Sequence, residues 1–159
     1  MTTVQGSEEW VKQRLGKVTA SVIHKVYSDK LTATKKNLMR SLALERLSGS
    51  RMSNIKTVDM APGIAIEPLA RKAYEIATQQ KVSLVGFISH PDIKNAGASP
   101  DGLIGEKGFI EIKCLNIRNH NQIIKNKKIP KQYYYQMQFQ LACLQREWGD
   151  FVAYHPEAD

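Results

Sequence analysis

The apolar residues in the first half of this chain recur at the spacing of α-helices. They predict a short helix over residues 7–15, a second helix capped by Thr19, and an amphipathic helix over residues 34–47. A further helix is expected over residues 69–77, with Pro68 restarting or kinking it. The stripe that we expect to be buried on the helix over 34–47 is formed by Leu38, Leu42 and Leu47.

The second half of the chain changes to the shorter repeat of β-strands. Apolar residues 103–104 and 109–115 flank the polar turn Gly105-Glu-Lys-Gly108, and this pattern predicts a β-hairpin. We also expect a loop over 50–59, a strand over 81–89, a helix or loop over 116–128, a helix over 130–147 and a strand over 150–154. Helices followed by a hairpin, a helix and a strand predict an α/β or α+β fold.

Size and composition narrow the class of protein. The chain has 159 residues, 42% of them hydrophobic, which suffices for one compact core and predicts a single domain over residues 1–159. No apolar run approaches the ~18 residues of a membrane-spanning helix, and no secretion signal opens the chain. Cys114 and Cys143 are too few for a disulfide framework or a zinc cluster. We therefore expect a cytoplasmic protein with no membrane partner.

The net charge favours a polyanionic partner. Lys and Arg number 23 against 15 Asp and Glu, which gives a formal charge of +8 and a pI near 9.5. Part of this excess lies just after the predicted hairpin, at Arg118, Lys125, Lys127, Lys128 and Lys131. That segment would lie along a DNA groove, or it is a solvated loop; a basic but inert surface is the alternative for the chain as a whole.

The candidate chemistry lies on the predicted hairpin. Glu111 and Lys113 are two residues apart on a strand, so their side chains project from the same face, and Asp101 begins the partner strand. Two carboxylates that converge beside an ammonium repel each other unless a cation lies between them, and hard oxygen ligands select Mg²⁺ or Mn²⁺. The carbonyl of Ile112 could reach the same ion. An ordinary surface hairpin with a Glu/Lys pair is the alternative.

The chain resembles the phage lambda exonuclease and YqaJ-type viral recombinase family, within the restriction-endonuclease-like PD-(D/E)xK nuclease superfamily. The resemblance runs from Glu9 to about Pro156. The matching motifs, in order, are Trp10-x-x-x-Arg14-Leu-Gly16, Val18-Thr-Ala-Ser21, Gly63-x-x-x-Glu67, Ala98-Ser-Pro-Asp-Gly102, Ile110-Glu-Ile-Lys-Cys114 and Tyr135-Gln-Met-Gln138. It implies a restriction-endonuclease-like core, with a small mixed central sheet flanked by helices. It also implies a further region after the last strand, so we expect a shortened relative or a piece of one.

The resemblance also implies a role for each matching residue. Asp101 and Glu111 would hold the metal, and Lys113 would act on the attacking water. Glu67 would help to hold a second ion, and Gln136 would position the site from the long helix. The residues that would surround the 5′-phosphate of the cut strand are Arg14, Ser21, Ser99 and, one position out of register, Arg118.

Some of these residues also have ordinary structural interpretations. Arg14 could extend from an exposed helix face, with its aliphatic stem packed on the surface. Ser21 could be a helix-turn serine, and Glu67 could be an acid that complements a helix dipole. Their occurrence together and in order favours the functional interpretation.

The function predicted from the resemblance is a Mg²⁺-dependent 5′→3′ exonuclease on double-stranded DNA. It would use one or two ions, produce single strands for recombination, work beside a single-strand annealing recombinase, and form a homotrimer. The first alternative is a nicking or structure-specific DNA endonuclease of the same fold, and the second is a non-catalytic DNA-binding module. An iron–sulfur variant is disfavoured because the cysteines for the cluster are missing.

Overall fold

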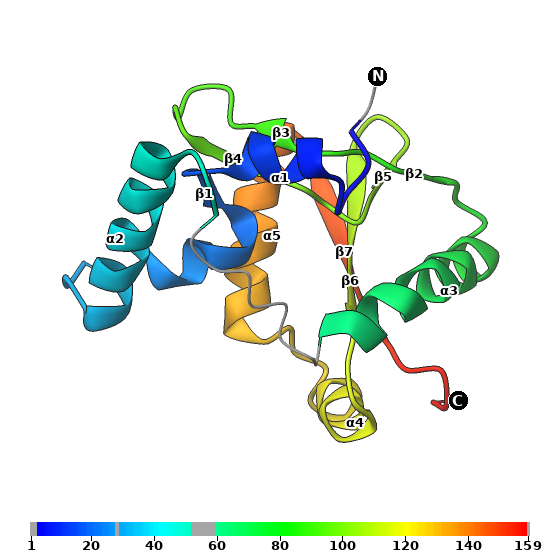
Figure 1. Cartoon of the computed structure of the whole chain (residues 1–159). Coiled ribbons are helices and arrows are strands. Elements are labelled where there is room, and N and C mark those ends of the chain that lie inside the picture. The colour runs from blue at the N-terminus through cyan, green and yellow to red at the C-terminus, as the bar shows by residue number, and fades with distance from the viewer. Residues whose placement is uncertain (1–2, 28, 52–59, 159) are drawn as a thin grey trace. The chain divides into compact units, whose positions relative to one another are not determined.

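The structure is a computed structural model that describes residues 3–27, 29–51 and 60–158 (Figure 1). The contacts divide the chain into two compact units. Unit 1 comprises Met1–Asn54, Val85–Pro100 and Gln132–Gln145, and unit 2 comprises Ile55–Leu84, Asp101–Lys131 and Arg146–Asp159. Among the described residues, no helix is both long and apolar enough to cross a membrane. The expectation of a single domain stays a prediction.

Unit 1 is mainly helical. Its elements are α1 (Glu8–Arg14), β1 (Val18–Thr19), the 3₁₀ helix η1 (Ala20–Lys25), α2 (Ala33–Ser48), β3 (Ile88–Ser89), β4 (Ala96–Ala98) and α5 (Lys131–Leu144). The small sheet has the order β1-β4-β3, in which β4 runs parallel to β1 and antiparallel to β3. The core of the unit joins Ala20 of η1, Ala98 of β4 and Cys143 of α5, with Phe139 packed against them.

Unit 2 is built on a four-stranded sheet. Its elements are α3 (Met60–Thr78), β2 (Val82–Ser83), β5 (Gly102–Ile104), β6 (Gly108–Cys114), α4 (Ile117–Asn126) and β7 (Trp148–Tyr154). The order is β2-β5-β6-β7; β5 and β6 form an antiparallel hairpin, and β7 lies parallel to β6. The core consists of Ala70, Tyr74, Val82, Ile104, Ile110 and Ile112. Helix α3 therefore packs on β6, the strand predicted to carry the chemistry.

The predicted hairpin forms, with a turn over residues 105–107 that is one residue shorter than expected because Gly108 already belongs to β6. Leu103 pairs with Phe109, and Ile104 pairs with Gly108 across the turn. Gly105 in the turn has a φ of +49°, a conformation that glycine adopts without strain. A β-carbon at Gly108 would lie 2.2 Å from the Trp148 ring, so the close approach of β7 to β6 requires glycine there. The mixed α/β fold, with small mixed sheets flanked by helices, confirms the predicted class.

The structure corrects three details of the helices. The helix after Thr19 is a short 3₁₀ helix, and the Thr19 hydroxyl lies 3.1 Å from that of Ser21 instead of capping it. None of the three leucines expected to form a buried stripe on α2 is buried: Leu38 and Leu42 are half-buried, and Leu47, at the end of the helix, is 85% exposed. Helix α3 runs without a break from residue 60 to 78 through Pro68.

The strand expected over 81–89 is also wrong. Residues 82–83 and 88–89 form two separate short strands, β2 and β3, which belong to different sheets and different units. Gly86 lies between the two segments and is the residue in this stretch that indicates an interruption of the strand. Most of the loop expected over 50–59 lies outside the described residues.

Candidate active site

The hairpin of unit 2 places the carboxylate of Asp101 against β6. Asp101 immediately precedes β5, and its backbone N–H donates to the carbonyl of Ile110 at 3.2 Å. Its Oδ2 accepts a hydrogen bond from the N–H of Ile112 at 2.6 Å. The side chain is thus fixed beside the middle of β6, between the positions of Glu111 and Lys113.

Glu111 and Lys113 contact each other on β6. The Lys113 Nζ lies 2.5 Å from Glu111 Oε1, as a direct ion pair. Glu111 is only 1% exposed. Its neighbours along the strand, Ile110 and Ile112, are also buried, but on the opposite face of β6, in the apolar core. A carboxylate buried to this extent is rare unless a cation accompanies it, and Lys113 supplies one positive charge.

Glu67 adds a third carboxylate to unit 2, from the middle of α3. Its Oε1 accepts from Arg71 Nη2 at 2.5 Å, one helical turn further along. Burial raises the pKa of Glu67, Arg71 opposes the increase, and the charge of Glu111 adds to it. Glu67 therefore responds to the field of the β6 carboxylate, but it holds its own cationic partner.

The electrostatics of these acids favour a bound cation. Burial raises the pKa of Asp101 well above its usual range, and the charges of Glu111 and Glu67 raise it further, against the opposing effect of Lys113. Neighbouring carboxylates in a desolvated place repel each other when both are ionised. Arg71 pairs with Glu67, and Lys113 alone does not offset the repulsion between Asp101 and Glu111, so a divalent ion would be favourable beside these two carboxylates.

The donor set fits a hard divalent cation. Asp101 and Glu111 offer carboxylate oxygens, and Ile112 between Glu111 and Lys113 offers a backbone carbonyl. Among the described residues, no three His, Cys, Asp or Glu side chains are grouped tightly enough to form a metal site by themselves. Mg²⁺ commonly binds through one or two carboxylates and keeps several waters, so this incomplete set suits it better than it suits Zn²⁺.

Unit 1 holds a separate cluster around Arg14. Its guanidinium lies 4.0 Å from the centre of the Trp10 ring, and its Nη1 donates to Ser99 Oγ at 3.1 Å. Trp10 Nε1 donates to the same hydroxyl oxygen at 3.0 Å. Burial, followed by the charge of Arg51, lowers the pKa of Arg14 to about 10. The guanidinium of Arg14 is thus oriented and desolvated, and the charge that acts on it is the positive charge of Arg51.

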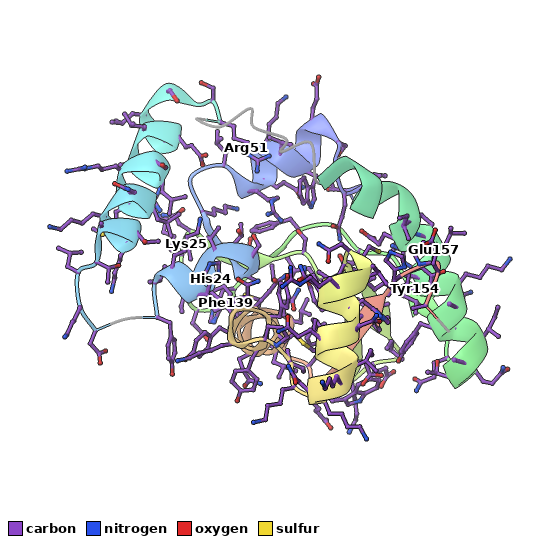
Figure 2. The ribbon with its side chains drawn as sticks, turned by 90° about the horizontal axis from the view of Figure 1, so that it is seen from below. His24, Lys25, Arg51, Phe139, Tyr154 and Glu157 are labelled. Carbon is purple, nitrogen blue, oxygen red and sulfur yellow. The ribbon has the colours of Figure 1, made fainter. Side chains whose placement is uncertain are left out.

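A cavity of about 220 Å³ lies beside this cluster within unit 1. Its charged lining residues are Arg14, Lys17, Lys25, Arg51 and Glu45; Figure 2 labels Lys25 and Arg51. The carboxylate of Glu45 already accepts from the backbone N–H of Gly16 at 3.0 Å. The cavity is therefore predominantly cationic, and its chemistry suits an anion such as a phosphate group.

The other predicted site residues are Ser21 and Gln136 in unit 1 and Arg118 in unit 2. Ser21 is exposed and pairs with Thr19, which lines the cavity. Gln136 is buried on α5 in unit 1. Arg118 is exposed in the first turn of α4 in unit 2. The structure thus brings Asp101, Glu111 and Lys113 together in one unit, and Arg14 and Ser99 in the other. The functional roles of all these residues stay predictions.

Sequence analysis did not assign roles to three side chains that shape these clusters. Trp10 and Arg71 each lie four residues from a predicted site residue on the same helix, Arg14 and Glu67 respectively, so the i,i+4 spacing was an available signal. Arg51 follows α2 and approaches Arg14 only through the fold. No pattern in the sequence indicates that contact.

The fold and the carboxylate–lysine hairpin define a nuclease of the α/β class. The model of the YqaJ-like viral recombinase domain matches residues 9–147, and the chain belongs to this family. An alkaline exonuclease from Laribacter hongkongensis, LHK-Exo, is 44% identical, with a TM-score of 0.89, covering 96% of this chain and 76% of that one.

Two further structures extend the comparison. LHK-Exo in complex with dAMP matches at the same identity and coverage, with a TM-score of 0.90. A phage-related exonuclease from Haemophilus somnus 129PT shares the fold at 20% identity and a TM-score of 0.60, covering 87% of this chain and 68% of that one. Among curated proteins, no sequence matches the chain.

Proposed function

We propose that this protein is a phage-type DNA exonuclease that depends on a divalent metal ion, preferably Mg²⁺ with Mn²⁺ as a substitute. The observation that carries the proposal is the hairpin of unit 2, which holds the Asp101 carboxylate on the N–H of Ile112 and pairs Glu111 with Lys113. Family membership and the 44% identity to an alkaline exonuclease support it. Asp101, Glu111, the Ile112 carbonyl and, for a second ion, Glu67 would hold the metal.

The chemistry follows from the residues on β6. A bound divalent ion polarises a phosphoryl oxygen and lowers the pKa of a bound water. The Lys113 ammonium, held in place by Glu111, donates hydrogen bonds that orient the attacking water and stabilise the charge that grows on the phosphorus oxygens. The Ile112 N–H holds one oxygen of the Asp101 carboxylate, and the second oxygen would serve as the metal ligand. Gln136 would position the substrate from α5.

The proposed polarity, 5′→3′, rests on unit 1. Arg14 and Ser99 form an anion-binding pair next to a cationic cavity, and Ser21, whose hydroxyl lies 3.1 Å from that of the cavity residue Thr19, is a further proposed contact. A terminal 5′-phosphate carries more charge than an internal diester, so a desolvated arginine selects strand ends. LHK-Exo binds dAMP, a nucleoside monophosphate of the kind that stepwise hydrolysis releases, and this supports removal of single nucleotides from duplex DNA.

One assay separates the candidate functions. The protein is incubated with linear and with covalently closed circular duplex DNA, with Mg²⁺ and with EDTA. Degradation of the linear DNA alone, only with Mg²⁺, is the expected result. Opening of the circle would favour the endonuclease alternative. DNA binding without any cleavage would leave a non-catalytic binding module and overturn the proposal.

The wider setting is part of the same proposal. Single strands left by such an enzyme are substrates for a single-strand annealing recombinase, which would act with it in the cytoplasm. A homotrimer would keep the enzyme on its DNA. Light scattering of the purified protein tests the trimer, and a monomer mass would remove both the trimer and the processivity that depends on it.

A further inference from the structure

Three tyrosines of unit 1 form an aromatic cluster at the surface. The rings of Tyr27 and Tyr135 stack with their centres 4.2 Å apart and an interplanar angle of 29°. Tyr134 meets Tyr135 edge-on, with ring centres 6.0 Å apart and an angle of 62°. Tyr27 follows η1, whereas the other two belong to α5, more than 100 residues later in the sequence. We call this group the tyrosine cluster.

The two outer members of the tyrosine cluster face solvent to an unusual degree. Tyr27 is 68% exposed and Tyr134 is 50% exposed, while Tyr135 between them is half-buried. Since Tyr135 covers one face of the Tyr27 ring, most of the exposed surface of Tyr27 belongs to its other face and its edge. Burial of such apolar surface is favourable, so exposed rings ordered by a third ring form a prepared stacking surface.

The charge around the tyrosine cluster suits a polyanion. Unit 1 contains eleven Lys and Arg against five Asp and Glu, a formal excess of six of the eight charges of the whole chain. Helix α5 contains no acidic residue, and its exposed positions next to Tyr134 are Lys131 and Gln138. Lys25 precedes Tyr27 by two residues and is labelled in Figure 2 on η1. Asp29 is the single acid within five residues of Tyr27.

We propose that the tyrosine cluster binds single-stranded DNA by stacking its bases on Tyr27 and Tyr134. Exposed aromatic rings in a basic setting bind unpaired bases of any sequence, because every base has a flat face. Bases inside a duplex are already stacked and paired, so the cluster selects the unpaired strand. The choice of DNA as the ligand rests on the proposed function, whereas the stacking geometry is observed in the structure. The site lies outside the residues assigned to the metal and to the 5′-phosphate.

Fluorescence anisotropy of labelled oligonucleotides tests the proposal. The full chain is titrated in EDTA, which prevents hydrolysis, against a twelve-nucleotide oligothymidylate and against an abasic oligomer of the same length. We expect Tyr27→Ala and Tyr134→Ala each to weaken oligothymidylate binding roughly tenfold, the range of one lost base stack. Binding of the abasic strand should stay the same, since it lacks bases. Tyr134→Trp should retain the affinity of the original protein.

A matched control removes exposed apolar surface elsewhere in unit 1. Leu47→Ala truncates a side chain that is 85% exposed and lies outside the tyrosine cluster, and it should leave both affinities unchanged. Thermal melting checks that each variant is folded. A measurement without any variant is photo-crosslinking to 5-iodouracil in the oligonucleotide, which should label peptides that contain Tyr27 or Tyr134.

Several results would overturn the proposal. These are unchanged oligothymidylate binding by folded alanine variants, equal losses for the abasic strand, or crosslinks elsewhere only. Variants that keep their DNA affinity but sediment as a smaller species would assign the cluster to contact between copies of the chain. Failure of the proposed function is distinguishable, because a protein that cleaves no DNA can still pass the binding test.

Discussion

The Nζ of Lys113 lies 2.5 Å from Oε1 of Glu111, and the two side chains project from the same face of β6. Because they are two residues apart on a strand, their side chains share a face. The contact matters because Glu111 is almost completely buried. Lys113 supplies the cation that makes an ionised carboxylate tolerable there. In the proposed mechanism, the same contact fixes the ammonium that would orient the attacking water.

Lys113→Ala should abolish DNA cleavage and leave DNA binding largely intact. Removal of a group that orients water and stabilises developing charge reduces the rate by about 10²–10⁴-fold. Single-turnover degradation of a linear duplex with Mg²⁺ measures the rate, and anisotropy in EDTA measures binding. The control is Lys107→Ala, which removes an exposed lysine paired with Glu147 in the same unit. Comparable cleavage by both variants would show that the assignment of Lys113 is wrong.

Asp101→Asn should stabilise the metal-free protein and remove its response to Mg²⁺. The raised pKa of Asp101 means that its ionised form is less favourable in the folded state than in the unfolded one, so a neutral amide removes a cost above that pKa. A ligand that binds only the folded state raises the melting temperature. We expect a higher melting temperature in EDTA and no increase on adding Mg²⁺.

The control for that experiment is Asp92→Asn, an exposed carboxylate in the turn after β3. It should behave as the original protein, with a normal Mg²⁺ shift. If Asp101→Asn kept the full shift, Asp101 would not be a metal ligand.

Arg14→Gln should abolish discrimination between 5′-phosphorylated and 5′-hydroxyl duplex ends. The substitution removes the cation that donates to Ser99 and lies over Trp10, and leaves a shorter, uncharged polar side chain. We expect the original protein to degrade phosphorylated ends at least about tenfold faster, since a charge-assisted hydrogen bond contributes about 1.5–3 kcal/mol. Lys12→Gln, an exposed residue on the same helix, should retain the preference. Equal rates on both ends with the original protein would remove the 5′-phosphate role.

Tyr74→Phe should lower the free energy of unfolding by about 1.5 kcal/mol at neutral pH. It removes the hydrogen bond from the Tyr74 hydroxyl to Asp150 Oδ2, 2.6 Å long, which joins α3 to β7 in unit 2. Urea denaturation measures the change. The matched control is Tyr154→Phe, which removes a tyrosine hydroxyl from β7 and should have a smaller effect. A Tyr74→Phe variant as stable as the original would mean that the bond contributes nothing.

The same tyrosine gives an alkaline signature. Burial and the nearby Asp150 raise the pKa of Tyr74 to about 12 from 10. A group whose pKa is raised by folding contributes stability below its unfolded pKa, and this contribution is lost as the pH rises through the folded value. The difference in stability between the original protein and Tyr74→Phe should therefore be constant up to about pH 10 and shrink between about pH 10 and 12. A difference that grows in this range would contradict the assignment.

The parts of the fold that were predictable are those set by local rules. The β5–β6 hairpin was predictable because two glycines bracket a short turn, and α2 because Gly49 ends it in a left-handed conformation. The prediction that Leu47 is buried was wrong, because helical spacing indicates which residues share a face but not how far along the helix its packing partner extends. The single strand expected over 81–89 was wrong because Gly86, which interrupts the β-strand pattern between the two short strands, was not taken as a break.

The site divides in the same way. The alternation of β6 predicted that Glu111 and Lys113 share a face, and the hairpin placed Asp101 opposite them. The hydrogen bond from Ile112 to Asp101, the low exposure of Glu111, and the charge of Arg51 near Arg14 depend on the assembled fold. Propensities and spacing do not contain that information, because it arises from residues far apart in the sequence.

The neighbouring strands β6 and β7 are parallel, and the chain that connects them passes through α4 of unit 2 and then α5 of unit 1. The polypeptide changes unit five times in all. No continuous stretch of the gene therefore encodes either unit. Cutting the gene at one position would yield neither unit 2, with Asp101 and Glu111, nor unit 1, with Arg14, by itself. The two activities that we assign to them would be inherited, lost and expressed as one.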